Sequence, residues 1–154
     1  MRKSKNQQKK KSDECKKEDM QSKMKILFVC HGNICRSAMA EYICKMYWPE
    51  IDCESAAVSY EEEGNDMYPK ARRCLDSHGV PYGRHRARRI QKADYDRFDE
   101  IYCMDDYNMR NILRIMEDPD RKIRKLRPYD IEDPWYTDNF EKVFEQLKEG
   151  IEDL

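Results

Sequence analysis

The chain has 154 residues, the length of a single domain with one hydrophobic core. Hydrophobic residues make up 39% of the sequence and charged residues 40%, so the composition predicts a soluble globular protein with a heavily charged surface. No stretch approaches the roughly 20 apolar residues of a membrane-spanning helix, which argues against a transmembrane protein, and no membrane partner is expected.

The charge is unevenly distributed along the chain. Residues 1–23 contain nine Lys or Arg and four Asp or Glu, a net charge of +5, whereas residues 24–154 contain 21 and 27, a net charge of −6. The first segment has only Met1, Cys15 and Met20 as apolar side chains, so we expect a disordered basic tail followed by one folded domain over residues 24–154. A basic tail can attract nucleic acid, but a solvated tail is the simpler interpretation, and no nucleic-acid partner is expected.

Seven cysteines are scattered along the chain, and no two of them form a Cys-x-x-Cys pair. An odd number of cysteines without a secretory signal argues against a disulfide framework and favours a reducing cytoplasm. The spacing of Cys30 and Cys35 is not that of a usual zinc site. The sequence therefore predicts a cytoplasmic protein, and no metal site is expected.

Short apolar runs alternate with helical periodicity from residue 24 onward. We expect strands at Lys25–Val29, Cys53–Val58, Glu100–Met104 and Ile123–Leu126. Between them we expect helices at 37–48, 69–77 and 107–116, the last of these capped by Asp105 or Asp106. A final helix follows the fourth strand, with apolar residues at helical spacing: Phe140, Val143, Phe144, Leu147 and Ile151. Asp138 stands three residues before Glu141, a variant of the capping box. This alternation predicts an α/β domain with a small parallel sheet.

The stretch MKILFVCHGNICRSAMAE, residues 24–41, joins the first strand to the first helix. A strand, a tight loop containing Gly32 and Asn33, and a helix start form an anion site, because amides and the helix dipole point at the ligand. Arg36 adds a planar fork that can hold two phosphate oxygens. The same groups favour the thiolate of Cys30, and Ser37 could donate to it. The pattern predicts a nucleophile within an oxyanion cradle.

A nucleophile needs an acid that protonates the leaving group. The stretch IEDPWYTDN, residues 131–139, supplies Asp133 before Pro134, and Trp135 and Tyr136 offer flat walls for an aromatic ligand. Taken alone, this stretch would be better explained as a surface turn before the last helix.

With both motifs in view, the sequence resembles the low-molecular-weight protein tyrosine phosphatases over residues 24–153. VCHGNICRSAMAE is similar to the family signature V-C-x-G-N-x-C-R-S-P-x-A-E, and EDPWY is similar to its D-P-aromatic-aromatic acid loop. The segments ESAAVS, HGVP, HRARRI and FDEIYCMDD match further family segments in the same order. The resemblance implies a three-layer α/β fold, a four-stranded parallel sheet of order 2-1-3-4 flanked by helices on both faces.

The resemblance also implies roles. Cys30 would be the nucleophile and form a phosphocysteine, Arg36 would bind the phosphoryl oxygens, and Asp133 would protonate the leaving group and then activate water. The residues expected around the substrate are His31, Gly32, Asn33, Ile34, Cys35, Ser37, Trp135 and Tyr136. Ser55 and His85 match family residues that keep the loop in shape. No metal or organic cofactor is implied. The implied substrates are phosphotyrosine proteins and small aryl phosphates, with a tyrosine kinase as a candidate partner of a monomeric enzyme.

Two parts of the cavity depart from the family pattern, and one matching cysteine has an implied role of its own. His31 occupies a position that is usually apolar, and the family's aromatic wall residue could be Tyr60 or be displaced by Glu61. Family members pair the cysteine matching Cys35 with the oxidised nucleophile, which implies a protective redox switch; packing alone is the alternative for this thiol.

Three other functions are weighed against phosphotyrosine hydrolysis. A thiol-linked arsenate reductase of this fold needs a pair of resolving cysteines, whereas Cys74 and Cys103 lie far apart and Cys103 falls in a predicted strand. Phosphoarginine phosphatases tend to carry Thr where Ile34 stands and lack two aromatics after the acid. A non-catalytic phosphate-binding module is disfavoured because nucleophile, arginine and acid are all present.

Overall fold

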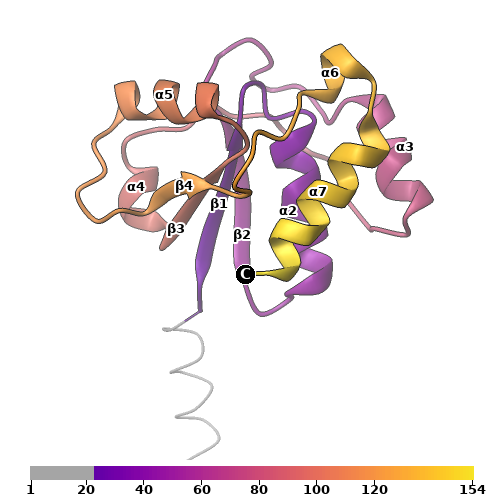
Figure 1. Cartoon of the computed structure of the whole chain (residues 1–154), viewed down its shortest axis with the longest axis horizontal. Coiled ribbons are helices and arrows are strands. Elements are labelled where there is room, and N and C mark those ends of the chain that lie inside the picture. Colours follow the sequence, from indigo (N-terminus) through magenta and orange to yellow (C-terminus); the bar gives the residue numbers. More distant parts are fainter. Residues whose placement is uncertain (1–22) are drawn as a thin grey trace, which may run out of the picture.

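The computed structural model describes residues 23–154, so the predicted basic tail, except for Lys23, lies outside the described residues. The elements follow one another as β1 (Lys25–Cys30), α2 (Arg36–Tyr47), β2 (Asp52–Ala57), α3 (Pro69–Ser77), α4 (Asp94–Arg97), β3 (Glu100–Cys103), α5 (Asp106–Ile115), β4 (Ile123–Lys125), α6 (Pro134–Thr137) and α7 (Phe140–Glu152) (Figure 1). No helix of this part of the chain is long and apolar enough to cross a membrane.

The four strands form one parallel sheet of order β2-β1-β3-β4, as predicted. Cys30 pairs with Ala57, and Val29 pairs with Cys103, so the carboxyl ends of the three longest strands lie at one edge. The chain moves from β1 to β2 on one side and then to β3 on the other. Ligands of such sheets bind at this change of direction, directly beyond the end of β1.

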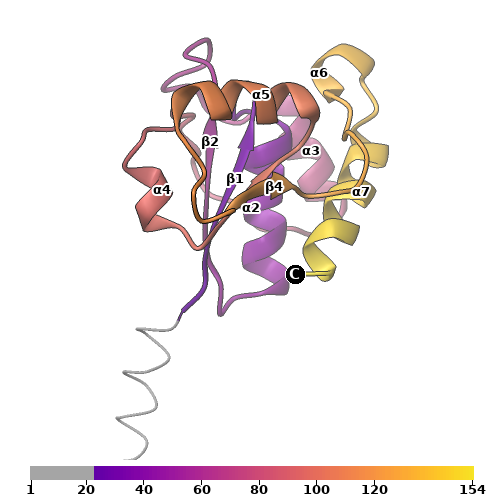
Figure 2. The same ribbon diagram turned by 60° about the vertical axis from the view of Figure 1, so that its left-hand side comes forward.

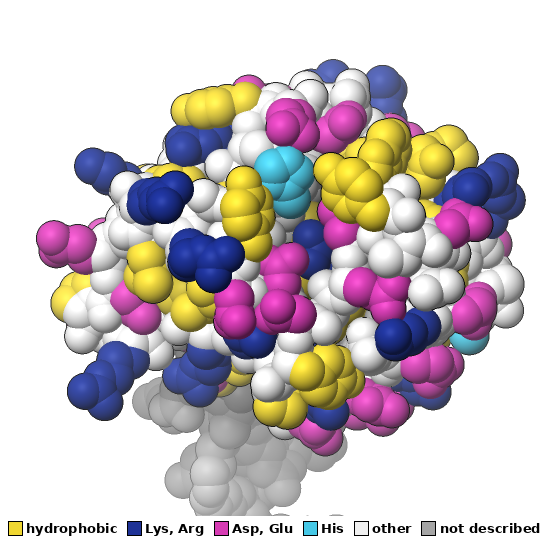
Figure 3. Space-filling view, turned by 45° about the horizontal axis from the view of Figure 1, so that its top comes forward, with side chains coloured by type: hydrophobic (Ala, Val, Ile, Leu, Met, Phe, Trp, Pro, Cys, Tyr) yellow, Lys and Arg dark blue, Asp and Glu magenta, His cyan; other side chains and the backbone are white. Residues whose placement is uncertain are grey.

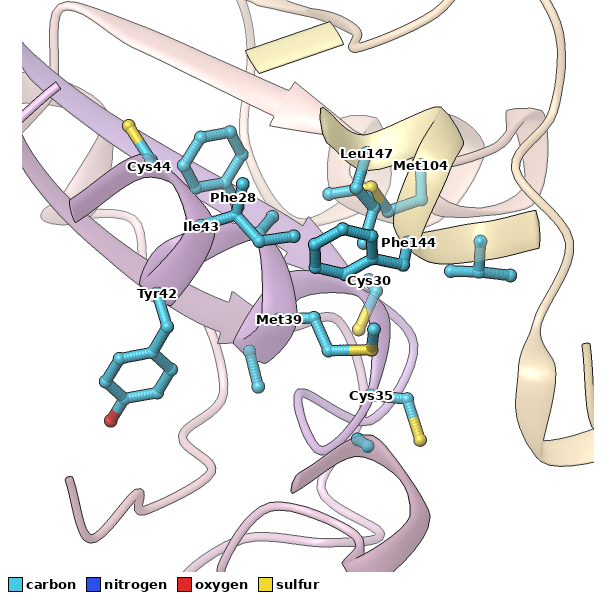
Figure 4. Packing of buried hydrophobic residues seen from close by; sticks show 14 of the residues in the cluster. Phe28, Cys30, Cys35, Met39, Tyr42, Ile43, Cys44, Met104, Phe144 and Leu147 are labelled. Atoms are coloured by element: carbon cyan, nitrogen blue, oxygen red, sulfur yellow. The ribbon is translucent and has the colours of Figure 1, made fainter. Parts of the chain in front are cut away.

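Helices cover both faces of the sheet, which gives three layers (Figure 2). Ile26 and Phe28 of β1 belong to a buried cluster with α2, α3 and α7, whereas Leu27 and Val29 belong to a second cluster with α4 and α5. The alternation follows from the pleat, which sends successive side chains to opposite faces. On the first face, Phe144 of α7 lies close to labelled core residues of α2 (Figure 4).

The predicted strands and long helices are all present, with ends that differ by a residue or two. Two four-residue helices, α4 and α6, were not predicted, because so short a segment has too few residues to show helical periodicity. The predicted capping box at the last helix is wrong. Asp138 adopts a left-handed conformation at the end of α6, and its carboxylate pairs with Lys70 at 2.6 Å, while Asn139 precedes α7 without a side-chain cap.

Candidate active site

The loop between β1 and α2 is closed around the sulfur of Cys30. Cys30 is 3% exposed, and its Sγ accepts a hydrogen bond from the backbone amide of Asn33 at 3.3 Å. The hydroxyl of Ser37, in the first turn of α2, lies 3.0 Å from the same sulfur. The end of a buried strand therefore holds a thiol among donors that stabilise negative charge on sulfur.

Asn33 holds the loop in this shape. Its φ of 62° lies in the left-handed region, which asparagine tolerates better than most residues. Its side-chain amide donates to Ser37 Oγ at 2.8 Å, and its Oδ1 accepts from the backbone amide of Arg88 at 3.2 Å. The buried ring of His85 bonds through Nε2 to the backbone oxygen of Asn33 at 2.6 Å. Asn33 is thus fixed from both sides of the loop.

Ser37 has one hydroxyl proton and two neighbours that can accept it. Its Oγ lies 3.3 Å from the backbone oxygen of Ala56 and 3.0 Å from Cys30 Sγ. Beside a neutral thiol, the hydroxyl donates to Ala56 and accepts from the sulfur. Beside a thiolate, the same proton can turn to the sulfur, because a thiolate has no proton to donate and only accepts, while Oγ still accepts from the Asn33 amide. The hydroxyl can therefore follow the charge of Cys30.

Arg36 joins three segments of the chain through one buried guanidinium. NH1 donates to Asp105 Oδ2 at 2.6 Å and to the backbone oxygen of Ile131 at 2.8 Å, and NH2 lies 3.6 Å from Asp133 Oδ2. Burial alone would lower the pKa of Arg36, but the negative charges of Cys30, Asp105 and Asp133 outweigh it and raise the pKa. Arg36 therefore stays a cation at the base of the site.

Asp133 caps the short helix α6. Its Oδ1 accepts from the backbone amide of Trp135 at 3.0 Å, and Pro134 occupies the first helical position, where a missing amide proton costs nothing. This turn leaves the other carboxylate oxygen directed at Arg36. It also places Trp135 against Tyr68, with ring centroids 4.7 Å apart.

Cys30, Asn33, Arg36 and Asp133 line one cavity of about 60 Å³, whereas Ser37, which was also expected around the substrate, does not line it. Its lining consists of Cys30, His31, Gly32, Asn33, Ile34, Cys35, Arg36, Glu61, Glu62, Asp133, Trp135 and Tyr136. Acidic and hydrophobic side chains and a histidine lie together on the face shown in Figure 3. A group with the five heavy atoms of a phosphoryl ester fits a cavity of this size.

The rim of the cavity differs from a purely aromatic mouth. Glu61 lines it, and its carboxylate lies 3.0 Å from His31 Nε2. Tyr60 does not line it; the ring is 65% exposed, with the guanidinium of Arg89 4.3 Å from its centre. Of the two candidates for the wall position, the structure thus places Glu61 at the cavity.

The structure corrects the prediction for Ser55. Its hydroxyl donates to Glu41 Oε1 at 2.6 Å, and the other oxygen of Glu41 is bound by Lys45 at 2.6 Å. Ser55 therefore contacts the body of α2 and not the loop. The pleat directs the Ser55 side chain to the face that α2 covers, and β2 reaches Ser37 only through the backbone oxygen of the next residue, Ala56.

Cys35 is 5% exposed and lies beside the nucleophile candidate in the cavity lining. Burial, with smaller contributions from Cys30 and Asp133, raises the pKa of the Cys35 thiol. Cys35 therefore carries a proton at neutral pH.

Sequence reasoning missed two partners of Arg36. Asp105 was predicted only as a helix cap, and it does accept from the Asn108 amide at 2.7 Å; its second oxygen binds Arg36. Ile131 contributes a backbone oxygen, which no side-chain pattern could reveal. Asp105 stands two residues beyond the end of β3, so the rule that ligands bind beyond the carboxyl ends of parallel strands was the signal that could have located it.

Comparison with known proteins agrees with this geometry. The family model for low molecular weight phosphotyrosine protein phosphatases matches residues 25–154. The chain is 38% identical over 138 residues to the Gallus gallus low molecular weight phosphotyrosine protein phosphatase, covering 79% of this chain and 87% of that one. It is 37% identical over 143 residues to the Homo sapiens protein of the same name, covering 82% and 90%.

Solved structures give the same result. The low molecular weight protein tyrosine phosphatase SP-PTP from Streptococcus pyogenes superposes with a TM-score of 0.80 at 34% identity, over 84% of this chain and 89% of that one. A family model that spans the whole described domain, relatives above 30% identity and a shared fold all point to one group. The chain therefore belongs to the low molecular weight phosphotyrosine protein phosphatase family.

Proposed function

We propose that the protein hydrolyses phosphotyrosine in proteins, and small aryl phosphates, through a phosphocysteine intermediate. The observation that carries this is the convergence of Cys30, Arg36 and Asp133 on one cavity, with the Asn33 amide donating to the Cys30 sulfur and the Ser37 hydroxyl 3.0 Å from it. The names of the related proteins support the same substrate class.

In the first step, the Cys30 thiolate attacks the phosphorus. The S–P bond forms while the P–O bond to the tyrosine ring breaks, and the carboxyl group of Asp133 gives its proton to the departing phenolate oxygen. Arg36 holds two equatorial oxygens of the transferring group, and the Asn33 amide, freed from the sulfur as its charge is lost, can donate to a third. The negative charge that develops on the phosphoryl oxygens is therefore stabilised by donors that are already in position.

In the second step, water replaces sulfur on phosphorus. The Asp133 carboxylate takes a proton from the water while the water oxygen bonds to phosphorus. The S–P bond breaks, and its electron pair returns to the sulfur of Cys30. The leaving thiolate then receives the Ser37 hydroxyl proton as a hydrogen bond, across the 3.0 Å contact. Inorganic phosphate leaves, and Asp133 carries the proton needed for the next turnover.

The mouth of the cavity supports a ring-bearing substrate. Trp135 is 51% and Tyr136 is 81% exposed, so both present apolar surface to a bound ligand. Because Tyr68 packs against Trp135, the indole is held on one side and open on the other. Glu61 and Glu62 make the opposite rim acidic, so peptides with basic residues beside the phosphotyrosine suit it better than acidic peptides.

The alternative functions lack support in the structure. Cys103 is fully buried in the central sheet, and the thiol of Cys74 faces α7, so these two cysteines cannot act as a mobile resolving pair for arsenate. Ile34 lines the cavity where a phosphoarginine enzyme tends to carry threonine, and both aromatics after the acid are present. Phosphotyrosine hydrolysis fits all of these positions.

We also propose that the enzyme acts as a monomer in the cytoplasm on the products of tyrosine kinases. All six cysteines of the described residues are free thiols, which suits a reducing compartment. Every site residue lies within 24–154, the proposed catalytic domain, so we expect the basic tail over 1–23 to be dispensable for turnover of small substrates.

The test compares three phosphopeptides of one sequence that carry phosphotyrosine, phosphoserine or phosphoarginine. We expect phosphotyrosine to be turned over far faster, because a serine phosphate is too short to reach Cys30 while its peptide stays at the rim. Cys30→Ser should abolish turnover and still bind vanadate. Comparable rates for the three peptides, or appreciable turnover by Cys30→Ser, would overturn the proposal.

A further inference from the structure

Three side chains with metal-binding chemistry meet where α3 packs against α7, outside the cavity. They are Cys74 and His78, at the end of α3, and Glu141, in the first turn of α7; their ligand atoms all lie within 4.8 Å of one another. Each carboxylate oxygen of Glu141 lies near a different one of the other two side chains. Oε1 lies 3.6 Å from Cys74 Sγ, and Oε2 lies 2.7 Å from His78 Nε2.

The backbone and the core already hold these side chains in place. Cys74 lies in the last part of α3, and His78 is the residue that ends it, with its backbone amide bonded to the backbone oxygen of Cys74 at 3.3 Å. The ring of His78 stacks on Phe144 with centroids 3.7 Å apart and an angle of 9°. The two helices run beside each other in both views (Figures 1 and 2), and they are in direct contact. Two of the three ligands are therefore held by packing before any metal binds.

The charge around the thiol favours a cation. The carboxylates of Glu141 and Glu145 are the charged groups that act on the Cys74 thiol. Both charged groups that act on this thiol are acidic, so a thiolate alone is disfavoured, whereas a divalent cation would be attracted by the same charges. Glu141 is 69% exposed and His78 is 27% exposed, which leaves a path from solvent to the thiol.

We propose that Cys74 Sγ, His78 Nε2 and the Glu141 carboxylate form a binding site for Zn²⁺ or a similar borderline divalent cation. A sulfur, an imidazole nitrogen and a carboxylate oxygen are the three kinds of atom that zinc prefers, and three protein ligands leave a fourth, tetrahedral position for water. The carboxylate already lies between the other two ligands. The ligand atoms lie within 4.8 Å of one another, so metal bonds of about 2.0–2.3 Å require the three side chains to move slightly closer together.

Metal binding at this site would release a proton. The metal replaces the thiol proton of Cys74, which leaves to solvent, and it binds the unprotonated Nε2 of His78. With one thiolate and one carboxylate, the Zn²⁺ site is neutral overall. A bound ion would fasten the end of α3 to the start of α7, which also carries Phe140, a packing partner of Tyr68.

This inference departs from the sequence-based expectation of no metal site. Cys-x-x-x-His on one helix supplies only two ligands, and the third comes 63 residues later, from another helix. The site is also independent of the proposed catalytic function, because it contains neither Cys30 nor any other residue of the cavity lining.

The experiment titrates the full chain with Co²⁺, which gives a thiolate-to-cobalt absorption band in the near ultraviolet, and then with Zn²⁺ as competitor. Cys15→Ser, Cys30→Ser and Cys35→Ser are combined as the background, so that the thiols of the cavity and of the basic tail do not contribute. We expect one Co²⁺ per chain, displacement by Zn²⁺, and release of a proton measured as buffer-dependent binding heat.

Substitutions in that background separate ligands from neighbours. Cys74→Ser should remove the cobalt band. His78→Gln should weaken Zn²⁺ binding by about 100-fold or more, and Glu141→Gln should weaken it by about 10-fold or more. Glu145→Gln, one turn further along α7, is the matched control, and we expect less than about a threefold change because it removes a nearby charge and no ligand. Circular dichroism checks that each variant is folded; if Cys74→Ser is not, the other two variants decide.

Three results would overturn the proposal. One is a cobalt band that persists in folded Cys74→Ser. Another is Zn²⁺ affinity unchanged in both His78→Gln and Glu141→Gln. The third is no saturable Co²⁺ or Zn²⁺ binding by the background protein.

Discussion

Asp105→Asn tests whether Arg36 needs its ion pair with Asp105 in order to act on a phosphoryl group. Asp105 uses one oxygen to cap α5 through the Asn108 amide and the other to bind Arg36 at 2.6 Å. Asparagine caps a helix as well as aspartate does. Because its oxygen must stay on the Asn108 amide, the introduced NH₂ group faces the guanidinium, and two donors meet. The substitution thus removes the ion pair and keeps the cap.

The expected loss follows from the burial of this pair. Arg36 is 3% and Asp105 is 19% exposed in their side chains, so solvent screens the interaction weakly. A hydrogen bond to a charged group contributes about 1.5–3 kcal/mol. If the loss falls on the transition state, where Arg36 must be aligned, kcat/KM falls about 10- to 150-fold, at 1.36 kcal/mol for each factor of ten.

The assay is steady-state hydrolysis of p-nitrophenyl phosphate, with urea unfolding as a measure of stability. Asp106→Asn is the matched control, because it removes the same charge one residue further on, from an exposed carboxylate that pairs with Lys125 and not with Arg36. Asp105→Ala should lose about 1 kcal/mol more stability than Asp105→Asn, since it also removes the cap. A value of kcat/KM within threefold of wild type in Asp105→Asn, or an equal loss in Asp106→Asn, would refute the reasoning.

Three further predictions concern the acid, the rim and the second thiol. Asp133→Asn should slow turnover of esters with poor leaving groups by about 10²–10⁴-fold and spare those with acidic leaving groups; equal losses across a series of substituted phenyl phosphates would indicate that Asp133 only positions Arg36. Glu61→Tyr should lower KM for aryl phosphates about 2- to 10-fold, because an aromatic pair contributes about 0.5–1.5 kcal/mol; an unchanged KM would show that residue 61 does not face the ring. Cys35→Ser should keep most turnover but lose most of the activity that a thiol reductant restores after peroxide treatment, since the family resemblance implies a disulfide that protects Cys30 from further oxidation; recovery equal to wild type would leave Cys35 with a packing role only.

The sequence by itself was sufficient for the features that are local. A strand, a glycine and an asparagine in a tight loop, and a helix start are contiguous in residues 24–41, and the left-handed Asn33 follows from that short stretch. The parallel sheet followed from alternating strands and helices, because each helix must return the chain to the same end of the sheet. The Asp133 turn was visible for the same reason, since Pro134 and the aromatics directly follow it.

Only the tertiary structure decided the contacts that join distant segments. Arg36 meets Asp105 and Ile131, 69 and 95 residues later, because β1, β3 and the acid loop end at one edge of the sheet. Ser55 turned to Glu41 and away from the loop, since the pleat determines which side each residue of β2 faces. The cluster of Cys74 with Glu141 arises in the same way, from two helices packed on one face, and no spacing within a single segment encodes which side chains such packing brings together.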